Sequence, residues 1–120
     1  MTYIILTNNK SFDTDKVEIQ RVEGDFECLL EKARDLVHIG YKLEVSPLPA
    51  SHRMLFSPVR TLILSKGNIP DEESNMLIER DLEKYRLTMG ERKADFKNLE
   101  DYEFVDRDLA MGALEELGIK

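Results

Sequence analysis

Hydrogen-bond donors gather in one stretch of this sequence that contains no carboxylate. No Asp or Glu occurs between Glu44 and Asp71. Within that stretch, residues 46–60 form what we call the central segment. Its polar side chains are Ser46, Ser51, His52, Arg53, Ser57 and Arg60. Because a guanidinium offers a planar fork of N–H groups that suits carboxylate or phosphate oxygens, we interpret the central segment as a candidate anion site.

The elements on either side would bring a second group of donors to the same place. Asn8 and Asn9 follow the apolar run 3–7, and the central segment follows a predicted strand at 41–45. Ligands of open α/β sheets bind beyond the carboxyl ends of parallel strands. If the two strands are parallel neighbours, Asn8, Asn9 and the central segment converge on one crevice. The alternative is a structural loop whose arginines pair with surface acids.

Composition excludes several classes of function. The chain has 120 residues, which suits one domain, and a net charge of −7. That charge argues against nonspecific binding to nucleic acid or to an anionic membrane, because both require clustered Lys and Arg. His38 and His52 are the only histidines, and neither zinc-ligand spacing nor a phosphate loop nor a dinucleotide fingerprint occurs. We therefore predict no metal, no cofactor and no catalytic residue.

The same features predict a cellular location. Cys28 is the only cysteine, so an intrachain disulfide is excluded and a reducing compartment is favoured. The first residues carry no basic leader, and no apolar run approaches the roughly twenty residues of a membrane span. We expect a cytoplasmic protein that does not insert into a membrane.

The amino-terminal half reads as strands around one helix. Strands are predicted at 3–7, 17–22 and 41–45. Between the last two, apolar residues at helical spacing predict a helix from Phe26 to Val37, with Asp25 as N-cap and Gly40 as the residue that ends it. A strand, a helix and a strand in this order predict a βαβ unit with parallel strands.

The second half is less regular. Residues 59–64 predict a strand and residues 71–89 a helix, followed by a polar, mobile connection at 91–101. A short strand at 102–105 and a helix at 106–117 complete the prediction. The expected fold is one α/β domain with a mainly parallel sheet of four to five strands and helices packed against it, a Rossmann-like three-layer arrangement.

Three stretches of the chain resemble a known family. They are TNN after the first strand, ARDLVHIGYKLEVSPLPAS through the βαβ unit, and SPVRTLILSK after the loop, and they resemble the GrdX family over residues 3–66. The resemblance implies a small protein encoded beside the selenium-dependent glycine, sarcosine and betaine reductases of amino-acid-fermenting anaerobes. The family pattern has histidine where Ser46 stands and proline where Lys10 stands. It supplies no catalytic residues.

Two functions therefore stand side by side. The first is a non-catalytic accessory or binding protein that takes a small anion or an acidic protein surface. The alternative is a small enzyme that acts on an anionic substrate in the crevice of Asn8, Ser51 and Arg53. The scarcity of bases, nucleophiles and metal ligands favours the first. In addition, Met76 and Leu87 lie off the main apolar stripe of the 71–89 helix, and we predict that they form a homodimer contact unless the carboxy-terminal helix covers them.

Overall fold

Four strands form one mixed sheet in the computed structural model of the chain, which describes residues 2–119. The strands are β1 (Tyr3–Thr7), β2 (Glu18–Arg21), β3 (Lys42–Leu43) and β4 (Thr61–Ser65), in the order β2-β1-β4-β3. β1 and β2 are parallel, whereas β4 runs antiparallel to both β1 and β3. The prediction of a mainly parallel, Rossmann-like sheet is therefore wrong.

The central segment explains the change of direction. A parallel return needs a crossover connection, usually a helix, over one face of the sheet. Residues 46–60 contain only the short 3-10 helix η1 (His52–Phe56), and they re-enter the sheet antiparallel to β3. β2 and β3 do point the same way, as a βαβ unit requires, but β1 and β4 lie between them. The unbroken apolar run of β4 reflects burial on both faces, which does not specify strand direction.

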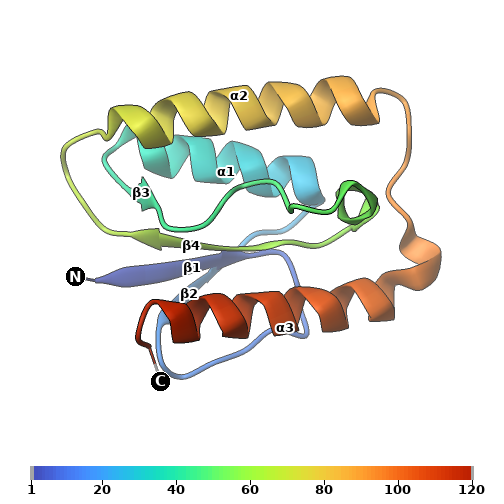
Figure 1. Cartoon of the computed structure of the whole chain (residues 1–120), viewed down its shortest axis with the longest axis horizontal. Coiled ribbons are helices and arrows are strands. Elements are labelled where there is room, and N and C mark those ends of the chain that lie inside the picture. Colours follow the sequence, from blue (N-terminus) through green and yellow to red (C-terminus); the bar gives the residue numbers. More distant parts are fainter. Residues whose placement is uncertain (1, 120) are drawn as a thin grey trace.

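Helices cover both faces of the sheet. α1 (Phe26–His38) and α2 (Glu72–Met89) lie on one face and α3 (Leu99–Glu116) on the other (Figure 1). The predicted N-cap of α1 is confirmed, because the side chain of Asp25 accepts a hydrogen bond from the Cys28 amide. Gly40 ends this helix with a φ of 120°, which an L side chain rarely adopts.

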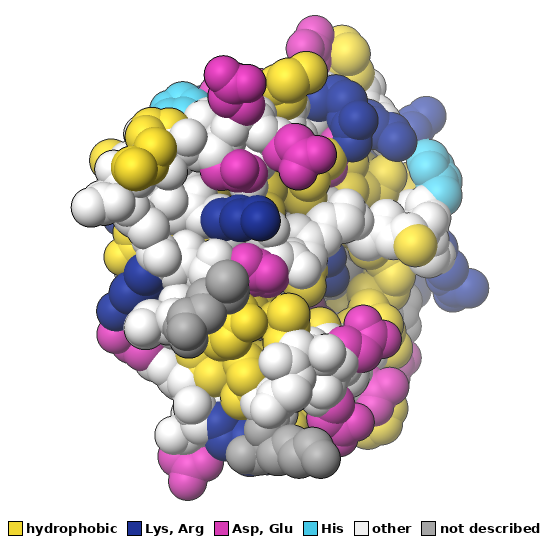
Figure 2. Space-filling model, turned by 60° about the vertical axis from the view of Figure 1, so that its left-hand side comes forward, with side chains coloured by type: hydrophobic (Ala, Val, Ile, Leu, Met, Phe, Trp, Pro, Cys, Tyr) yellow, Lys and Arg dark blue, Asp and Glu magenta, His cyan; other side chains and the backbone are white. Residues whose placement is uncertain are grey.

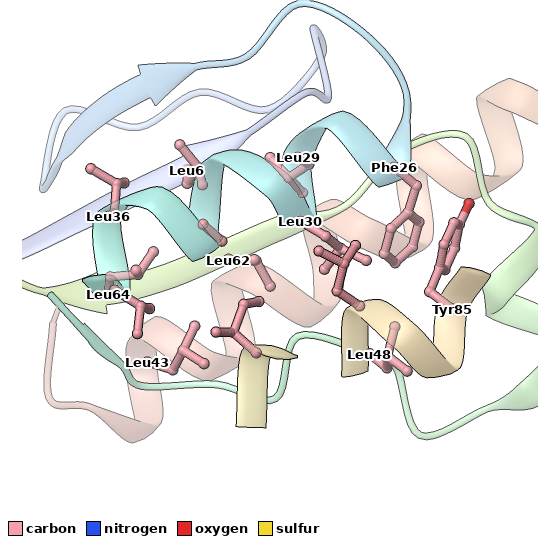
Figure 3. Packing of buried hydrophobic residues seen from close by; sticks show 14 of the residues in the cluster. Leu6, Phe26, Leu29, Leu30, Leu36, Leu43, Leu48, Leu62, Leu64 and Tyr85 are labelled. Carbon is pink, nitrogen blue, oxygen red and sulfur yellow. The ribbon is translucent and has the colours of Figure 1, made fainter. Parts of the chain in front are cut away.

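The larger core lies between the sheet and the α1/α2 pair. Leucines from α1, β1 and β4 meet there, and the ring of Phe26 stacks on that of Tyr85 with centroids 4.8 Å apart (Figure 3). Leu36 is buried in this cluster, as the helical stripe predicts. At its edge, a Cβ on Gly40 would lie 2.8 Å from the backbone of Asn68, so the two connecting loops pack in direct contact.

The carboxy-terminal prediction requires correction. The predicted strand at 102–105 is wrong, and α3 begins at Leu99 rather than at 106, just after the 3-10 turn η2 (Phe96–Asn98). The buried stripe of α3 is Tyr102, Asp106, Ala110 and Leu114, four residues apart. Because one member of that stripe is a carboxylate, the helical period was not recognisable as an apolar pattern.

The outer surface of α2 leaves its apolar residues uncovered. Met76 and Leu87 are 74% and 76% exposed. α3 lies on the opposite face of the sheet and does not cover them (Figure 1). The homodimer contact stays a prediction. None of the helices within residues 2–119 combines the length and apolar character that crossing a membrane requires.

Candidate functional site

The end of β1 and the start of β4 lie side by side, and this brings Asn8 to the central segment. Thr7 is paired with Thr61 in the sheet. The Asn8 amide donates to the carbonyl oxygens of Gly24 and Pro58, at 3.1 and 2.9 Å. Its Oδ1 accepts from the Arg60 amide at 2.8 Å. Asn8 therefore contacts the end of the central segment through an antiparallel pair and connects three segments, but it lines a different hollow from Ser51 and Arg53.

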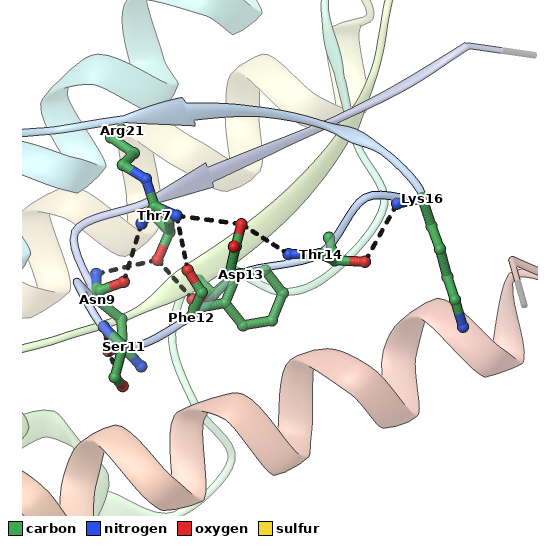
Figure 4. Close-up of polar contacts among 9 residues, drawn as sticks. Thr7, Asn9, Ser11, Phe12, Asp13, Thr14, Lys16 and Arg21 are labelled. Carbon is green, nitrogen blue, oxygen red and sulfur yellow. Dashed lines mark hydrogen bonds and ion pairs between the residues drawn. The ribbon is translucent and has the colours of Figure 1, made fainter.

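Asn9 is also occupied inside the protein. Its Oδ1 accepts from the amide and hydroxyl of Ser11, and its Nδ2 donates to the Glu103 carbonyl oxygen and to Asp106 Oδ2. The adjacent loop is held by Arg21, whose Nη2 donates to the Phe12 carbonyl oxygen at 2.8 Å (Figure 4). These contacts fix the course of residues 8–16.

Two serines of the central segment have local structural roles. The Ser57 hydroxyl is buried, donates to the Val59 carbonyl oxygen at 2.7 Å and accepts from the Val59 amide at 3.1 Å. The Ser46 hydroxyl donates to the Leu48 carbonyl oxygen at 3.0 Å. Both shape the loop through contacts within two residues.

Ser51, His52 and Arg53 are exposed. The His52 ring packs edge-on against Phe56, with centroids 6.3 Å apart. Ser51 and Arg53 line a hollow of about 310 Å³ with Asn98 and Asp101 of the α3 end. The structure thus separates these exposed side chains from the half-buried Asn8 and the buried Asn9.

Two backbone carbonyl oxygens of the central segment position the guanidinium of Arg60. Its Nε donates to the Pro47 carbonyl oxygen at 3.2 Å and its Nη2 to the Ser46 carbonyl oxygen at 2.6 Å. Burial lowers the pKa of the guanidinium, and the nearby Asp106 carboxylate partly offsets this shift. Arginine nevertheless remains charged at neutral pH. The carbonyl oxygens of the prolyl loop therefore hold a fixed positive group.

Arg60 lines a groove of about 640 Å³ between the central segment and α3. Most of its lining is apolar: Val45, Leu48, Pro49, Ala50, Met54, Ile63, Val105, Leu109, Ala110 and Ala113. Glu116 lines the groove from the helix side. Ser51, Met54 and Val105 also line the smaller hollow beside Arg53, so the two depressions adjoin.

Sequence reasoning missed the buried carboxylate beside this groove. Asp106 is 2% exposed. Its Oδ1 accepts from the Thr61 amide at 2.9 Å, and its Oδ2 accepts from Thr61 Oγ1 at 2.6 Å and Asn9 Nδ2 at 3.0 Å. The Thr7 and Thr61 hydroxyls are 2.7 Å apart. This network fastens α3 to the ends of β1 and β4. Because α3 contains many acidic residues, a single sequence does not distinguish the buried Asp106 from the exposed acids around it.

The hydrogen bonds of Asp106 limit the chemistry that this carboxylate can perform. Three donors occupy the Asp106 carboxylate, which leaves it poorly placed to take a proton from a substrate. Across residues 2–119, no cluster of three or more His, Cys, Asp or Glu side chains could hold a metal ion.

The comparisons with known proteins identify a family. Residues 4–115 match the model of a family described as GrdX-like protein. No curated protein and no solved structure matches the chain.

Proposed function

We propose that this chain, which belongs to the GrdX-like protein family, is a non-catalytic accessory protein. In this proposal it binds an anionic group of its ligand in the groove between the central segment and α3. The family resemblance suggests that it serves an anaerobic amino-acid reductase system. The presence of a single cysteine, Cys28, which cannot form an intrachain disulfide, supports a location in the reducing cytoplasm.

The position of Arg60 carries this proposal. Two of its nitrogens are held by backbone carbonyl oxygens, and no hydrogen bond within residues 2–119 uses Nη1. No buried side-chain nitrogen or oxygen in the same residues lacks a partner, so Nη1 is accessible to solvent. A pre-oriented guanidinium between apolar walls fits a carboxylate that carries an apolar group.

The experiment is a titration followed by amide chemical shifts. Octanoate, butyrate and sulfate are added to the ¹⁵N-labelled protein. We expect octanoate to shift the amides of Arg60, Val105 and Leu109 at lower concentration than butyrate does. The reason is that burial of each added methylene can contribute up to about 0.8 kcal/mol to the binding free energy. Sulfate tests whether charge alone suffices.

Two variants assign the anion subsite. Arg60→Met keeps much of the apolar stem and removes the charge, so it should abolish the octanoate shifts. Arg92→Met removes an exposed arginine that does not line the groove and should leave them intact. A thermal melt of each variant confirms that it is folded. Octanoate binding that is equal in Arg60→Met and wild type would refute the role of Arg60.

A further inference from the structure

The groove and the hollow beside Arg53 together form one long depression beside α3. Its α3 lining runs from Asn98, next to the first residue of the helix, to Glu116 at its last. A helix of 18 residues extends about 27 Å at 1.5 Å per residue. A small carboxylate fills only part of such a length. The shape therefore indicates an elongated occupant.

Opposite charges line the two walls of this depression. The central segment contributes Arg53 and Arg60, and the α3 side contributes Asp101 and Glu116. Among the ion pairs formed within residues 2–119, none includes any of these four side chains. An occupant between the walls would meet positive charge on one flank and negative charge on the other.

Apolar groups lie between these charges. Val105 and Leu109, one helical turn apart, are 38% and 47% exposed and line the groove. Ala113 continues the same row one turn further. Figure 2 shows that hydrophobic side chains also reach the surface among acidic and basic side chains on one face of the molecule. A row of apolar groups at four-residue spacing matches the apolar stripe of another helix.

We propose that the groove binds an amphipathic helix of a partner protein, lying along α3. Its apolar stripe would contact Val105 and Leu109. Acidic side chains on one flank would face Arg53 and Arg60, and basic side chains on the other would face Asp101 and Glu116. This inference rests on the proposed function only for the location of the site.

Two observations favour this occupant over others. A second copy of α3 is disfavoured by its charge, since the helix carries Glu100, Asp101, Glu103, Asp106, Asp108, Glu115 and Glu116 against Arg107 alone. An extended strand would need a free sheet edge. Of the two edge strands, β2 and β3, it is β3 that leads into the central segment, and its Leu43 amide is already bonded to the Ser74 hydroxyl at 3.0 Å.

The first test selects peptides from a display library of random 18-residue sequences on the wild-type protein. We expect the enriched peptides to carry apolar residues at positions i, i+4 and i+7, an acidic flank and a basic flank. Leu109→Glu should weaken their binding about tenfold or more in fluorescence anisotropy, as loss of a central apolar contact does. Leu87→Glu places the same charge on the exposed surface of α2 and should change binding less than about twofold.

The second test exchanges the charges of the two walls. Arg53→Glu combined with Asp101→Lys keeps the net charge, and both positions are exposed. The selected peptides should bind this variant more weakly, and peptides with their two flanks exchanged should bind it more tightly than they bind wild type. Selection without helical enrichment, or equal binding to Leu109→Glu and wild type, would overturn the helix proposal. Unchanged affinities in the charge exchange would overturn the assigned flanks.

The octanoate titration of the same samples separates the two proposals. If octanoate shifts the Arg60 amide but no helical peptide is enriched, the anion subsite stands and the helix inference falls. If helical peptides bind and octanoate does not, the groove is a protein-binding surface without an independent anion subsite.

Discussion

The two faces of the sheet are covered in different ways. On one face, α1 and α2 lie together over a large cluster of buried leucines, isoleucines and aromatic rings. On the other face, α3 lies over a small cluster around Ile5, Phe12 and Ile63, with the buried carboxylate of Asp106 within its contact stripe. The first cluster is apolar and buried, although a hollow of about 620 Å³ lies outside it between β3 and the start of α2. The second face leaves a groove beside its helix, which is where a ligand can reach ordered donors.

This contrast assigns different sources of stability to the two faces. The α1/α2 face depends on apolar burial, which is non-directional and loses free energy when a cavity is created. The α3 face depends on directional hydrogen bonds around Asp106, and a change of one partner leaves a buried polar group without its hydrogen bond. The predictions below test that difference, from the largest expected effect to the smallest.

Leu36→Ala should produce the largest loss. The side chain is buried between α1 and the sheet, so its truncation removes apolar contacts and leaves a cavity. We expect the free energy of unfolding to fall by about 2–5 kcal/mol in urea denaturation. A midpoint close to that of wild type would show that the α1/α2 face is not the buried core described here.

Asp106→Asn should cost less, about 1–3 kcal/mol. In the native network the Asn9 side-chain amide and the Thr61 hydroxyl both donate to the carboxylate. The N–H group of an asparagine at position 106 would face one of these donors, so a hydrogen bond would be lost. The exposed Asp108 on the same helix provides the matched control, and Asp108→Asn should change stability little. Equal losses in the two variants would mean that the network contributes nothing specific.

Tyr85 gives the α1/α2 face a dependence on alkaline pH. Burial raises the pKa of its phenol from 10.0 to about 12, with smaller contributions from Asp25 and Glu27. Because the folded protein holds this proton when the unfolded chain releases it, stability is full below pH 10 and is lost as pH rises towards 12. Tyr85→Phe should make unfolding between pH 10 and 12 less steep when followed by circular dichroism. An unchanged slope would contradict the assignment.

Leu109→Ser should have the smallest effect on folding. The side chain lies on the open groove wall and is partly in contact with water already. We expect the free energy of unfolding to change by less than about 0.5 kcal/mol in the same urea assay. A loss comparable to that of Leu36→Ala would show that the groove is closed in solution.

Local features of the sequence predicted the parts of the fold that depend on neighbouring residues. Asp25, the apolar stripe of α1 and Gly40 each act on residues close to them in the chain, and the helix they predict is present. The direction of β4 depends on how residues 46–60 return to the sheet, which no local pattern encodes. α3 was divided wrongly because the partners of Asp106, Asn9 and Thr61, are far away in the chain.

The site was predicted in part for the same reason. A stretch without carboxylates indicated where cations would remain unpaired, and Arg53 and Arg60 line two adjoining depressions. Residue type alone could not show that the amides of Asn8 and Asn9 and the hydroxyl of Ser57 are used within the fold. The opposite wall lies on α3, for which the sequence predicted a short strand at 102–105 and a helix only from 106.

The order of the elements along the chain also has a consequence for synthesis. The four strands and the central segment are complete once Ser65 has been added to the chain. The helix α3, which forms the other wall of the groove, ends only at Glu116. At 5–20 residues per second, a ribosome needs roughly 3–10 s to add the intervening residues. During that interval the nascent chain can pair its sheet but cannot form the groove. A partner that recognises the groove would therefore engage only chains whose translation has passed α3.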